Sequence, residues 1–373
     1  MEFMSVQAGL VGLPNVGKST LFNALTKSSI PAENYPFCTI DPHVAITNVP
    51  DPRLEKLSKI YGSQKLLPAS VTFVDIAGLV KGAAAGQGLG NQFLSHIREV
   101  DCILHVLRCF EDPNIIHTDN KVDPLADYEI IMSELMLKDL ESLEKRIPKV
   151  ERDVKINQNK PKEFKESTDE LVLLKQLMQT LNNGDADGAR ALVKNAIIPT
   201  IPLLSTKNFL VIANIAEAEI ENDGYVDNPH YQAVLKRFGK DLVIPVSAKV
   251  EYELSLLSDD EAQEMMAMLG LKEKSLDSII RQTYKELGLI TFFTCGPKEA
   301  HAWPLRKGTT VRKAAGEIHS DLERGFICAD VFNCRDLFEL GSEVAIKDKG
   351  RMRREGQDYI VQDGDLLNIK FNV

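Results

Sequence analysis

Short apolar runs alternate with segments of helical periodicity over most of the chain. The first run covers residues 6–11, and residues 19–25 have the apolar spacing of the start of a helix. Strands that alternate with helices are typical of a mainly parallel sheet covered by helices on both faces. We therefore expect an α/β domain whose later strands lie at 71–74, 103–107, 209–212 and 242–246.

A helical pattern replaces this alternation between about Asp127 and Thr206. Apolar residues recur there at steps of three and four along two segments, which is typical of a coiled-coil seam. The polar stretch 157–162 predicts the turn between two antiparallel arms, and Pro148 is expected to kink the first arm or delay its start. An ordinary helical insertion packed on the α/β domain is the alternative. The seam positions are Leu140, Leu143, Ile147, Val150 and Val154 in the first arm and Leu171, Leu174, Met178 and Leu181 in the second.

The character of the chain changes again at Thr291, where short β-rich segments surround one helix expected near residues 311–322. These segments read TFFTC, ICADVF, EVAIKD and YIVQDGDLLNIKFNV, and their total length suits a compact α+β domain. We therefore predict three parts. They are a discontinuous α/β domain at 1–127 and 206–288, a helical coiled-coil insertion at 128–205 and a C-terminal α+β domain at 289–373.

Composition and charge narrow the class of protein. The chain has 373 residues, of which 44% are hydrophobic and 26% are charged, as in a soluble globular protein of two or three domains. The sequence contains neither a bilayer-spanning apolar run nor an N-terminal signal, so we expect a cytoplasmic protein without a membrane partner. The net charge of −10 argues against non-specific coating of nucleic acid, and no DNA partner is expected.

The cysteines form no Cys-x-x-Cys pair and show no zinc-type spacing with histidine. Several lie in apolar runs, as Cys102 does in DCILHVL. Buried free thiols in a reducing cytosol are therefore expected. The six cysteines are Cys38, Cys102, Cys109, Cys295, Cys328 and Cys334.

Residues 12–19 read GLPNVGKS and match the phosphate-cradling P-loop pattern. The expected strand before the motif and the expected helix after it supply the context that the motif requires, which weakens the alternative of a chance match. The glycines let backbone amides converge on a polyphosphate at the N-terminus of a helix. Lys18 is expected to reach the β- and γ-phosphates, and the Ser19 hydroxyl to bind Mg²⁺. The predicted phosphate-binding residues are Asn15, Val16, Gly17, Lys18, Ser19 and Thr20.

The sequence DIAG at residues 75–78 directly follows the apolar run VTFV. An aspartate at the end of a strand, three residues before a glycine, suits a Walker-B role. Asp75 is expected to hold Mg²⁺ through water, and the Gly78 amide to face the γ-phosphate. Thr39, in PFCTIDP, is expected to complete the Mg²⁺ shell when the γ-phosphate is present. The predicted metal ligands are thus Ser19, Thr39 and Asp75.

Two later segments, NIAE at 214–217 and SAK at 247–249, follow predicted strands where a switch GTPase has its base-reading Asn-Lys-x-Asp and Ser-Ala-Lys segments. The order GLPNVGKS, PFCT, DIAGLVKGA, NIAE and SAK resembles the Obg-like ATPase (YchF) family of translation-factor-related, TRAFAC-class P-loop NTPases. The insertion and the C-terminal DYIVQDGDLLNIKFNV extend this resemblance over nearly the whole chain. The resemblance implies a P-loop G domain and a C-terminal TGS domain, which is a ubiquitin-like β-grasp fold.

The base-reading segment departs from the GTPase pattern in a way that changes the expected nucleotide. Ile215 replaces the lysine, and Glu217 replaces the aspartate that accepts the two adjacent donors of guanine. Guanine donors left unpaired cost about 1–3 kcal/mol each, so the residues favour ATP, read by main-chain groups near Asn214 and Ile215. The resemblance also implies ATP, and a GTP-using Obg-type protein of ribosome assembly is the alternative. The expected base contacts are Asn214, Ile215, Glu217, Ser247 and Ala248.

Leu79 occupies the place where Ras-like proteins carry a water-orienting glutamine, so slow hydrolysis is expected. Asn15 matches an asparagine that helps to hold K⁺ in related NTPases, although it could be an ordinary turn residue. His117 resembles a histidine implicated in hydrolysis in the Obg-like ATPases, and His96, on a predicted helix, is the weakest candidate. The glycine-rich stretch 78–90 suits a mobile switch that the γ-phosphate orders. The predicted catalytic residues are His117, Lys18, Gly78 and Asn15.

Two purposes fit these motifs: a Mg²⁺-dependent ATPase whose output is hydrolysis, and a nucleotide-controlled switch that docks on the ribosome. The missing glutamine and the appended parts favour the switch. The resemblance implies association with ribosomal particles and links to translation and stress responses. A basic cluster of the C-terminal domain could meet rRNA. A solvated face is the favoured alternative, because Asp348 and Glu355 dilute the cluster. The cluster consists of Lys347, Lys349, Arg351, Arg353 and Arg354.

Overall fold

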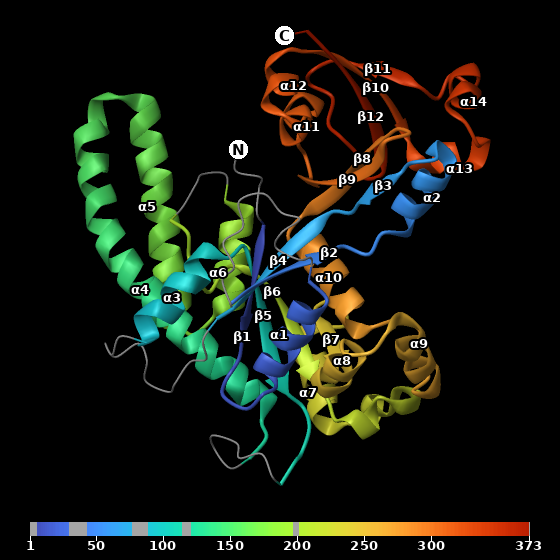
Figure 1. Ribbon diagram of the computed structural model, residues 1–373. Coiled ribbons are helices and arrows are strands. Elements are labelled where there is room, and N and C mark those ends of the chain that lie inside the picture. Colours follow the sequence, from blue (N-terminus) through green and yellow to red (C-terminus); the bar gives the residue numbers. More distant parts are fainter. Residues whose placement is uncertain (1–5, 30–42, 77–88, 114–120, 197–200, 373) are drawn as a thin grey trace. The chain divides into compact units, whose positions relative to one another are not determined.

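The computed structural model describes residues 6–29, 43–76, 89–113, 121–196 and 201–372 (Figure 1). Contacts between residues divide the chain into two compact units. One contains residues 9–24 and 74–271, and the other contains 1–8, 25–73 and 272–373. This division follows packing alone, so the domain boundaries given above stay a prediction.

A six-stranded sheet carries the N-terminal motifs, in the order β2-β4-β1-β5-β6-β7. β5 and β6 pair in parallel from Cys102↔Asn208 to Arg108↔Asn214, and β7 pairs with β6 in parallel. All seven residues of β5 are buried, as expected for an apolar strand covered on both faces. The predicted strands are therefore present. The bounds are β1 Gln7–Val11, β2 Val44–Asn48, β4 Ser70–Asp75, β5 Cys102–Arg108, β6 Asn208–Asn214 and β7 Val243–Val246.

The helices that accompany this sheet begin at clear sequence signals. Asn228 caps α7 by accepting from the backbone N–H groups of His230 and Tyr231, and a proline occupies the first turn. Ser258 and Glu261 form a capping box at the start of α9. The helices are α1 Lys18–Lys27, α3 Leu89–Glu99, α7 Pro229–Phe238, α8 Ala248–Leu254 and α9 Asp259–Met268, with the 3-10 segments Glu217–Glu219 and Glu221–Asp227.

Two long antiparallel helices form the insertion, as the periodicity predicts (Figure 1). They are α4 Pro124–Ile156 and α5 Pro161–Asn182, with a 3-10 turn Asn157–Asn159 between them and α6 Ala186–Asn195 after them. Leu143, Val150, Leu174 and Leu181 are buried along the seam. The expectation that Pro148 delays the first arm is wrong, because α4 is continuous through it. Pro148 is exposed, so water can reach the carbonyl group that its missing N–H leaves unpaired.

A buried carboxylate ties the insertion to the sheet. Asp139, on α4, accepts from the backbone N–H groups of Leu204 and Ser205 at 2.8 Å each and from the Ser205 hydroxyl at 2.7 Å. Burial raises the pKa of Asp139, and these hydrogen bonds oppose that effect. Because Leu204 and Ser205 lie shortly before β6, these bonds fix where the chain re-enters the sheet.

A second, mixed six-stranded sheet has the order β11-β10-β12-β8-β9-β3. β10 pairs antiparallel with β11 and β12, β8 pairs antiparallel with β9, and β3 joins the edge parallel to β9. The strands are β3 Lys65–Leu67, β8 Leu289–Cys295, β9 Glu299–Arg306, β10 Phe326–Asn333, β11 Arg353–Glu355 and β12 Asp365–Phe371. The helices of this unit are α2 Pro52–Tyr61, α10 Ser275–Glu286, α11 Val311–Ile318, α12 Ser320–Arg324, α13 Cys334–Leu340 and α14 Glu343–Asp348.

Two details of the C-terminal part differ from the sequence expectation. EVAIKD is helix α14 rather than a strand, because the Ser342 hydroxyl accepts from the backbone N–H of Ala345 and caps it. Its Ile346 is buried and its Val344 is exposed. The single helix expected near 311–322 is two helices, broken where His319 adopts an extended backbone. The predicted fold class is otherwise confirmed: an α/β sheet, a long helical insertion and a C-terminal mixed sheet.

Candidate nucleotide-binding site

The P-loop connects the end of β1 to the start of α1, which is the strand, loop and helix context that the motif predicts. Asn15 and Gly17 both have positive backbone φ angles, of 64° and 93°. A Cβ on Gly12 would lie 2.8 Å from the Val106 carbonyl oxygen, so no larger residue fits at the first position. Gly12 and Gly17 therefore give the loop its shape.

Asn214 braces the P-loop from the end of β6. Its side-chain N–H donates to the Val16 carbonyl at 2.8 Å, and its side-chain oxygen accepts from the Ala248 backbone N–H at 3.0 Å. A Cβ on Gly17 would overlap the Asn214 amide nitrogen. One buried side chain thus joins the P-loop, NIAE and SAK segments, a role that the sequence pattern did not predict.

The phosphate-binding lysine and the Walker-B aspartate are ion-paired. Lys18 lies in the first turn of α1 and Asp75 at the end of β4, and their side chains are 9% and 16% exposed. Of the neighbouring predicted residues, Ser19 is exposed and Thr20 is half-buried. The ammonium group of Lys18, the carboxylate of Asp75 and the hydroxyl groups in the first turn of α1 therefore lie in one region. These are the groups that a metal-bound polyphosphate requires.

The expected base-reading residues have distinct surroundings. The Ile215 side chain is buried, and its backbone N–H donates to the Val246 carbonyl at 2.9 Å. The Glu217 carboxylate is ion-paired with Lys249 at the surface. The Ser247 hydroxyl, at the start of α8, is buried without a hydrogen-bond partner among the described residues. A buried polar group in that state is ready for a ligand or a water.

Several predicted residues lie outside the described parts of the chain. These are Thr39, Gly78 and His117, together with Leu79 and most of the glycine-rich stretch. His96 is exposed on α3. The metal, γ-phosphate and hydrolysis roles given to the first three residues therefore stay predictions.

The basic cluster of the C-terminal part is largely neutralised by neighbouring acids. Arg351 pairs with Asp336 and Glu339 at 2.7 Å and 2.6 Å, and Arg354 with Asp330 at 2.9 Å. Arg353 lies 3.5 Å from Glu355. Lys347 and Lys349 are exposed, and the charge of Lys347 helps to lower the pKa of Asp330. This pairing favours the solvated-face interpretation over an rRNA patch.

Comparison with known proteins places these features in a family. The family model of the 50S ribosome-binding GTPase (MMR_HSR1) matches residues 7–144, and the YchF-GTPase C-terminal model, described as a protein of unknown function (DUF933), matches residues 289–372. The ribosome-binding ATPase YchF of Escherichia coli O157:H7 is 46% identical over 376 residues, covering 99% of this chain and 100% of that protein. The chain belongs to the YchF family. The YchF protein of Bacillus subtilis (strain 168) is 43% identical over 377 residues with the same coverage.

A solved YchF structure agrees with this assignment. The YchF GTPase of Schizosaccharomyces pombe superposes with a TM-score of 0.83 at 35% identity, covering 98% of both chains. The names of these YchF proteins differ over the nucleotide, since the two bacterial proteins are called ATPases and the yeast protein a GTPase. Within the described residues, no helix is both long enough and apolar enough to cross a bilayer.

Proposed function

We propose that this YchF protein binds and hydrolyses ATP with Mg²⁺ and acts as a nucleotide-controlled switch on the ribosome. The observation that carries the proposal is the braced P-loop, in which Asn214 holds the loop and Lys18 faces Asp75. The names of the bacterial relatives, ribosome-binding ATPases, support both the nucleotide and the partner. A cytoplasmic site of action agrees with that partner.

Oxygen donors suited to Mg²⁺ are present at the phosphate side of the site. The Ser19 hydroxyl and the Asp75 carboxylate are of the type that Mg²⁺ prefers, and Thr39 is the third proposed ligand. When bound with nucleotide, the metal would neutralise phosphate charge. Lys18 would contribute a second positive charge, and the P-loop amides would fix the orientation of the phosphates.

The base side favours ATP over GTP. The carboxylate that would have to accept guanine's donors belongs to Glu217, and Lys249 already pairs with it. The Ile215 N–H is also used, within the sheet. Main-chain groups of the 214–217 segment and the unpartnered Ser247 hydroxyl are therefore proposed to contact the nucleoside. Ala248, whose N–H is held by Asn214, would position that hydroxyl.

Hydrolysis is proposed to be slow, with His117 supplying what a glutamine would supply elsewhere and the Gly78 amide facing the γ-phosphate. Asn15, which has a positive backbone φ angle within the P-loop, is the proposed K⁺ contact. His117→Ala should lower turnover and leave ATP affinity unchanged. Near-normal hydrolysis in that variant would remove His117 from the catalytic residues, and equal rates in K⁺ and Na⁺ buffers would remove the K⁺ role.

Calorimetric titration with ATP and GTP, in Mg²⁺ and with K⁺ or Na⁺, tests the nucleotide assignment. Tighter binding of ATP is expected, and equal or tighter binding of GTP would instead favour the Obg-type GTPase. The family model described as a 50S ribosome-binding GTPase keeps that alternative open. Lys18→Ala is the control, since it should abolish turnover and leave the fold intact.

Cosedimentation with ribosomes tests the switch. Association that differs between ADP, ATP and a non-hydrolysable ATP analogue would support it, and association independent of nucleotide would leave only an ATPase. Lys347→Ala combined with Lys349→Ala tests whether the C-terminal part contributes charge to that contact. A role in translation control or stress would follow from the switch and would be tested in cells that lack the protein.

A further inference from the structure

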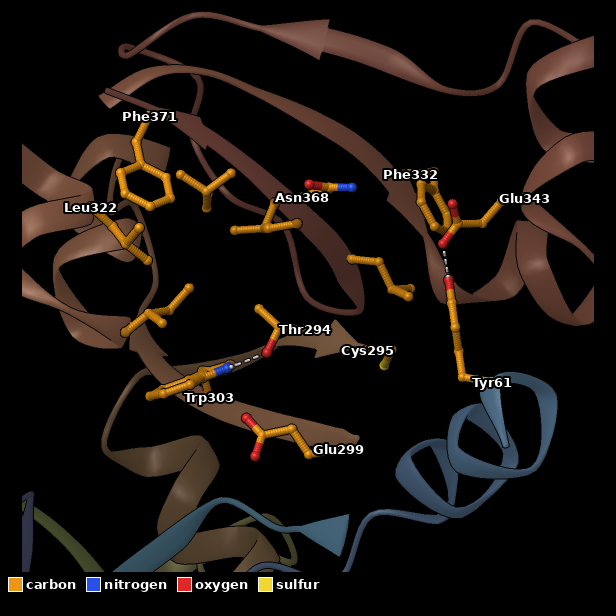
Figure 2. A pocket seen from close by; sticks show the side chains of 14 residues that line it. Tyr61, Thr294, Cys295, Glu299, Trp303, Leu322, Phe332, Glu343, Asn368 and Phe371 are labelled. Carbon is orange, nitrogen blue, oxygen red and sulfur yellow. Dashed lines mark hydrogen bonds between the residues drawn. The ribbon is translucent and has the colours of Figure 1, made fainter. Parts of the chain in front are cut away.

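A cavity of about 340 Å³ opens in the C-terminal mixed sheet, within one compact unit and separate from the P-loop (Figure 2). Its size lies at the low end of ligand pockets, which run from about 300 to 1,000 Å³. Strand residues from β8, β9, β10 and β12 line it, and Tyr61 of α2 and Glu343 of α14 close one side. Figure 2 shows these side chains pointing into a common space.

The cavity lies where two neighbouring strands separate. β12 and β8 pair in parallel at one position, Leu366↔Phe293, after which β8 ends at Cys295 while β12 continues to Phe371. The Asn372 N–H donates to the Gly325 carbonyl, on the side of β10. Backbone groups along a strand point alternately to its two sides, so those of Ile369 and Phe371 point away from β10. Those groups have no strand partner within the described residues.

The β8 edge of the opening follows the same alternation. The Gly296 N–H donates to the Glu299 carbonyl of β9 at 2.9 Å, which places the backbone groups of Cys295 on the side of the cavity. An unpaired strand edge is a template for an added strand. The cavity therefore offers main-chain hydrogen bonds to an extended segment.

The charged groups in the cavity are acidic. Glu299, at the start of β9, and Glu343 line it, and neither makes an ion pair with any residue that the structure describes. The Tyr61 hydroxyl donates to one oxygen of Glu343 at 2.5 Å, which fixes that carboxylate. Burial, together with the hydrogen bond to Glu343, raises the pKa of the Tyr61 hydroxyl, so Tyr61 stays a hydrogen-bond donor.

The remaining walls are apolar and aromatic. Trp303 forms one wall, and its indole N–H donates to the Thr294 hydroxyl at 2.9 Å. Leu322 and Phe371 lie on the opposite side of the cavity from Trp303 (Figure 2). Such walls suit the methylene stem and planar guanidinium of an arginine, whose fork of donors matches one carboxylate in a bidentate pair. Lysine offers a point charge and no planar group to stack.

We propose that this cavity is a binding site for an extended segment of a partner protein that carries an arginine. The arginine side chain packs along Trp303 and reaches Glu299, which lies beside Trp303 in Figure 2, and the backbone on either side pairs with the open edge of β12. Main-chain pairing supplies affinity in this mode, and the side-chain pocket supplies specificity. This site is independent of the nucleotide site and of the proposed ATPase activity.

Trp303 gives the experiment a direct signal, because it is the chain's single tryptophan and lines the cavity. The full chain is titrated with the capped peptide Ac-Thr-Val-Arg-Val-Thr-NH2 while tryptophan fluorescence is recorded. A saturable change is expected, with affinity lower on the order of tenfold for the same peptide with citrulline, which keeps the shape of arginine and lacks its charge. Absence of any change at millimolar peptide would overturn the proposal, as would equal affinity for the citrulline peptide.

Variants of the protein test the carboxylate. Glu299→Gln should weaken the arginine peptide on the order of tenfold, whereas Glu343→Gln, across the cavity, should change the affinity little. Asp358→Asn removes an exposed charge of the same unit outside the cavity and should change nothing. Glu299→Gln is the decisive variant, since Glu299 is exposed and its loss should spare the melting temperature. Unchanged affinity in Glu299→Gln refutes the arginine pocket.

Two further ligands test the strand pairing. N-acetylarginine amide has the side chain without the flanking backbone, and the pentapeptide N-methylated at both valines lacks donors beside the arginine. Both should bind more weakly than the parent peptide. If either binds as tightly, the extended segment is wrong and the cavity is a site for a free guanidinium compound.

Discussion

The ammonium group of Lys18 is ion-paired with the carboxylate of Asp75, so the two groups expected to hold phosphate and Mg²⁺ neutralise each other. Both side chains are largely buried, and neither can leave its partner without cost. Phosphates that take Lys18 leave Asp75 unpaired unless a cation arrives with them. Nucleotide and Mg²⁺ should therefore reinforce each other's binding.

Asp75→Asn should separate these effects. Without Mg²⁺, the variant should bind nucleotide more tightly than the wild type, on the order of tenfold, because no buried carboxylate is left unpaired. With Mg²⁺, its affinity should rise little. Calorimetric titrations in EDTA and in Mg²⁺ measure both values, with Asp241→Asn as an exposed control of the same unit. Equal Mg²⁺-free affinities of Asp75→Asn and wild type would show that the pair does not oppose binding.

Gly17→Ala should abolish nucleotide binding through a local clash. The added methyl group would displace the Asn214 amide, which holds Val16 and Ala248. Gly62→Ala is the matched control, since Gly62 also has a positive φ, of 62°, and open space around it. That control should cost about 1 kcal/mol of stability and leave binding intact. Retained affinity in Gly17→Ala would mean that Asn214 does not shape the loop.

Asp139→Ala should destabilise the protein by about 3 kcal/mol. It leaves two buried backbone N–H groups and the Ser205 hydroxyl without their acceptor. Glu141→Ala, on the exposed face of the same helix, removes a surface pair with Lys138 and a smaller attraction to Lys145, and should cost about 0.5 kcal/mol or less. Urea unfolding monitored by circular dichroism measures both variants. Similar losses in the two would contradict an anchoring role for Asp139.

His105 should make the protein less stable in mild acid. Burial, with a smaller contribution from Arg190, lowers the pKa of His105 from 6.5 to about 3. The unfolded chain therefore binds a proton between pH 6.5 and 3 that the folded chain does not. The free energy of unfolding should fall as pH drops through that window, by at most about 1.4 kcal/mol per pH unit from this residue.

His105→Phe tests this linkage, because a phenyl ring can pack in the same edge contacts with Tyr128 and Phe209. The variant should show a shallower loss of stability below pH 6.5 in urea unfolding. Exposed His96, replaced by glutamine, is the control and should leave the slope unchanged. An identical slope in wild type and His105→Phe would assign the acid sensitivity to other groups.

Much of the local structure could be predicted from the sequence, since local pattern sets it. The apolar run before Gly12 forms β1, the motif forms a loop, and Lys18 starts α1. The two helical arms likewise follow from apolar spacing, because that spacing gives each arm one buried face. The segment EVAIKD forms α14 instead of the expected strand, because Ser342 caps the helix and Ile346 is buried.

The sequence by itself determined where the phosphate loop, the two arms and strands β8, β10 and β12 lie, because periodicity and short motifs act over a few residues. Only the tertiary structure decided which distant groups meet. It paired Lys18 with Asp75, turned Asn214 onto the loop, and separated β12 from β8 to open a cavity. Such meetings depend on how strands are ordered and how buried polar groups find partners, and no local pattern encodes either.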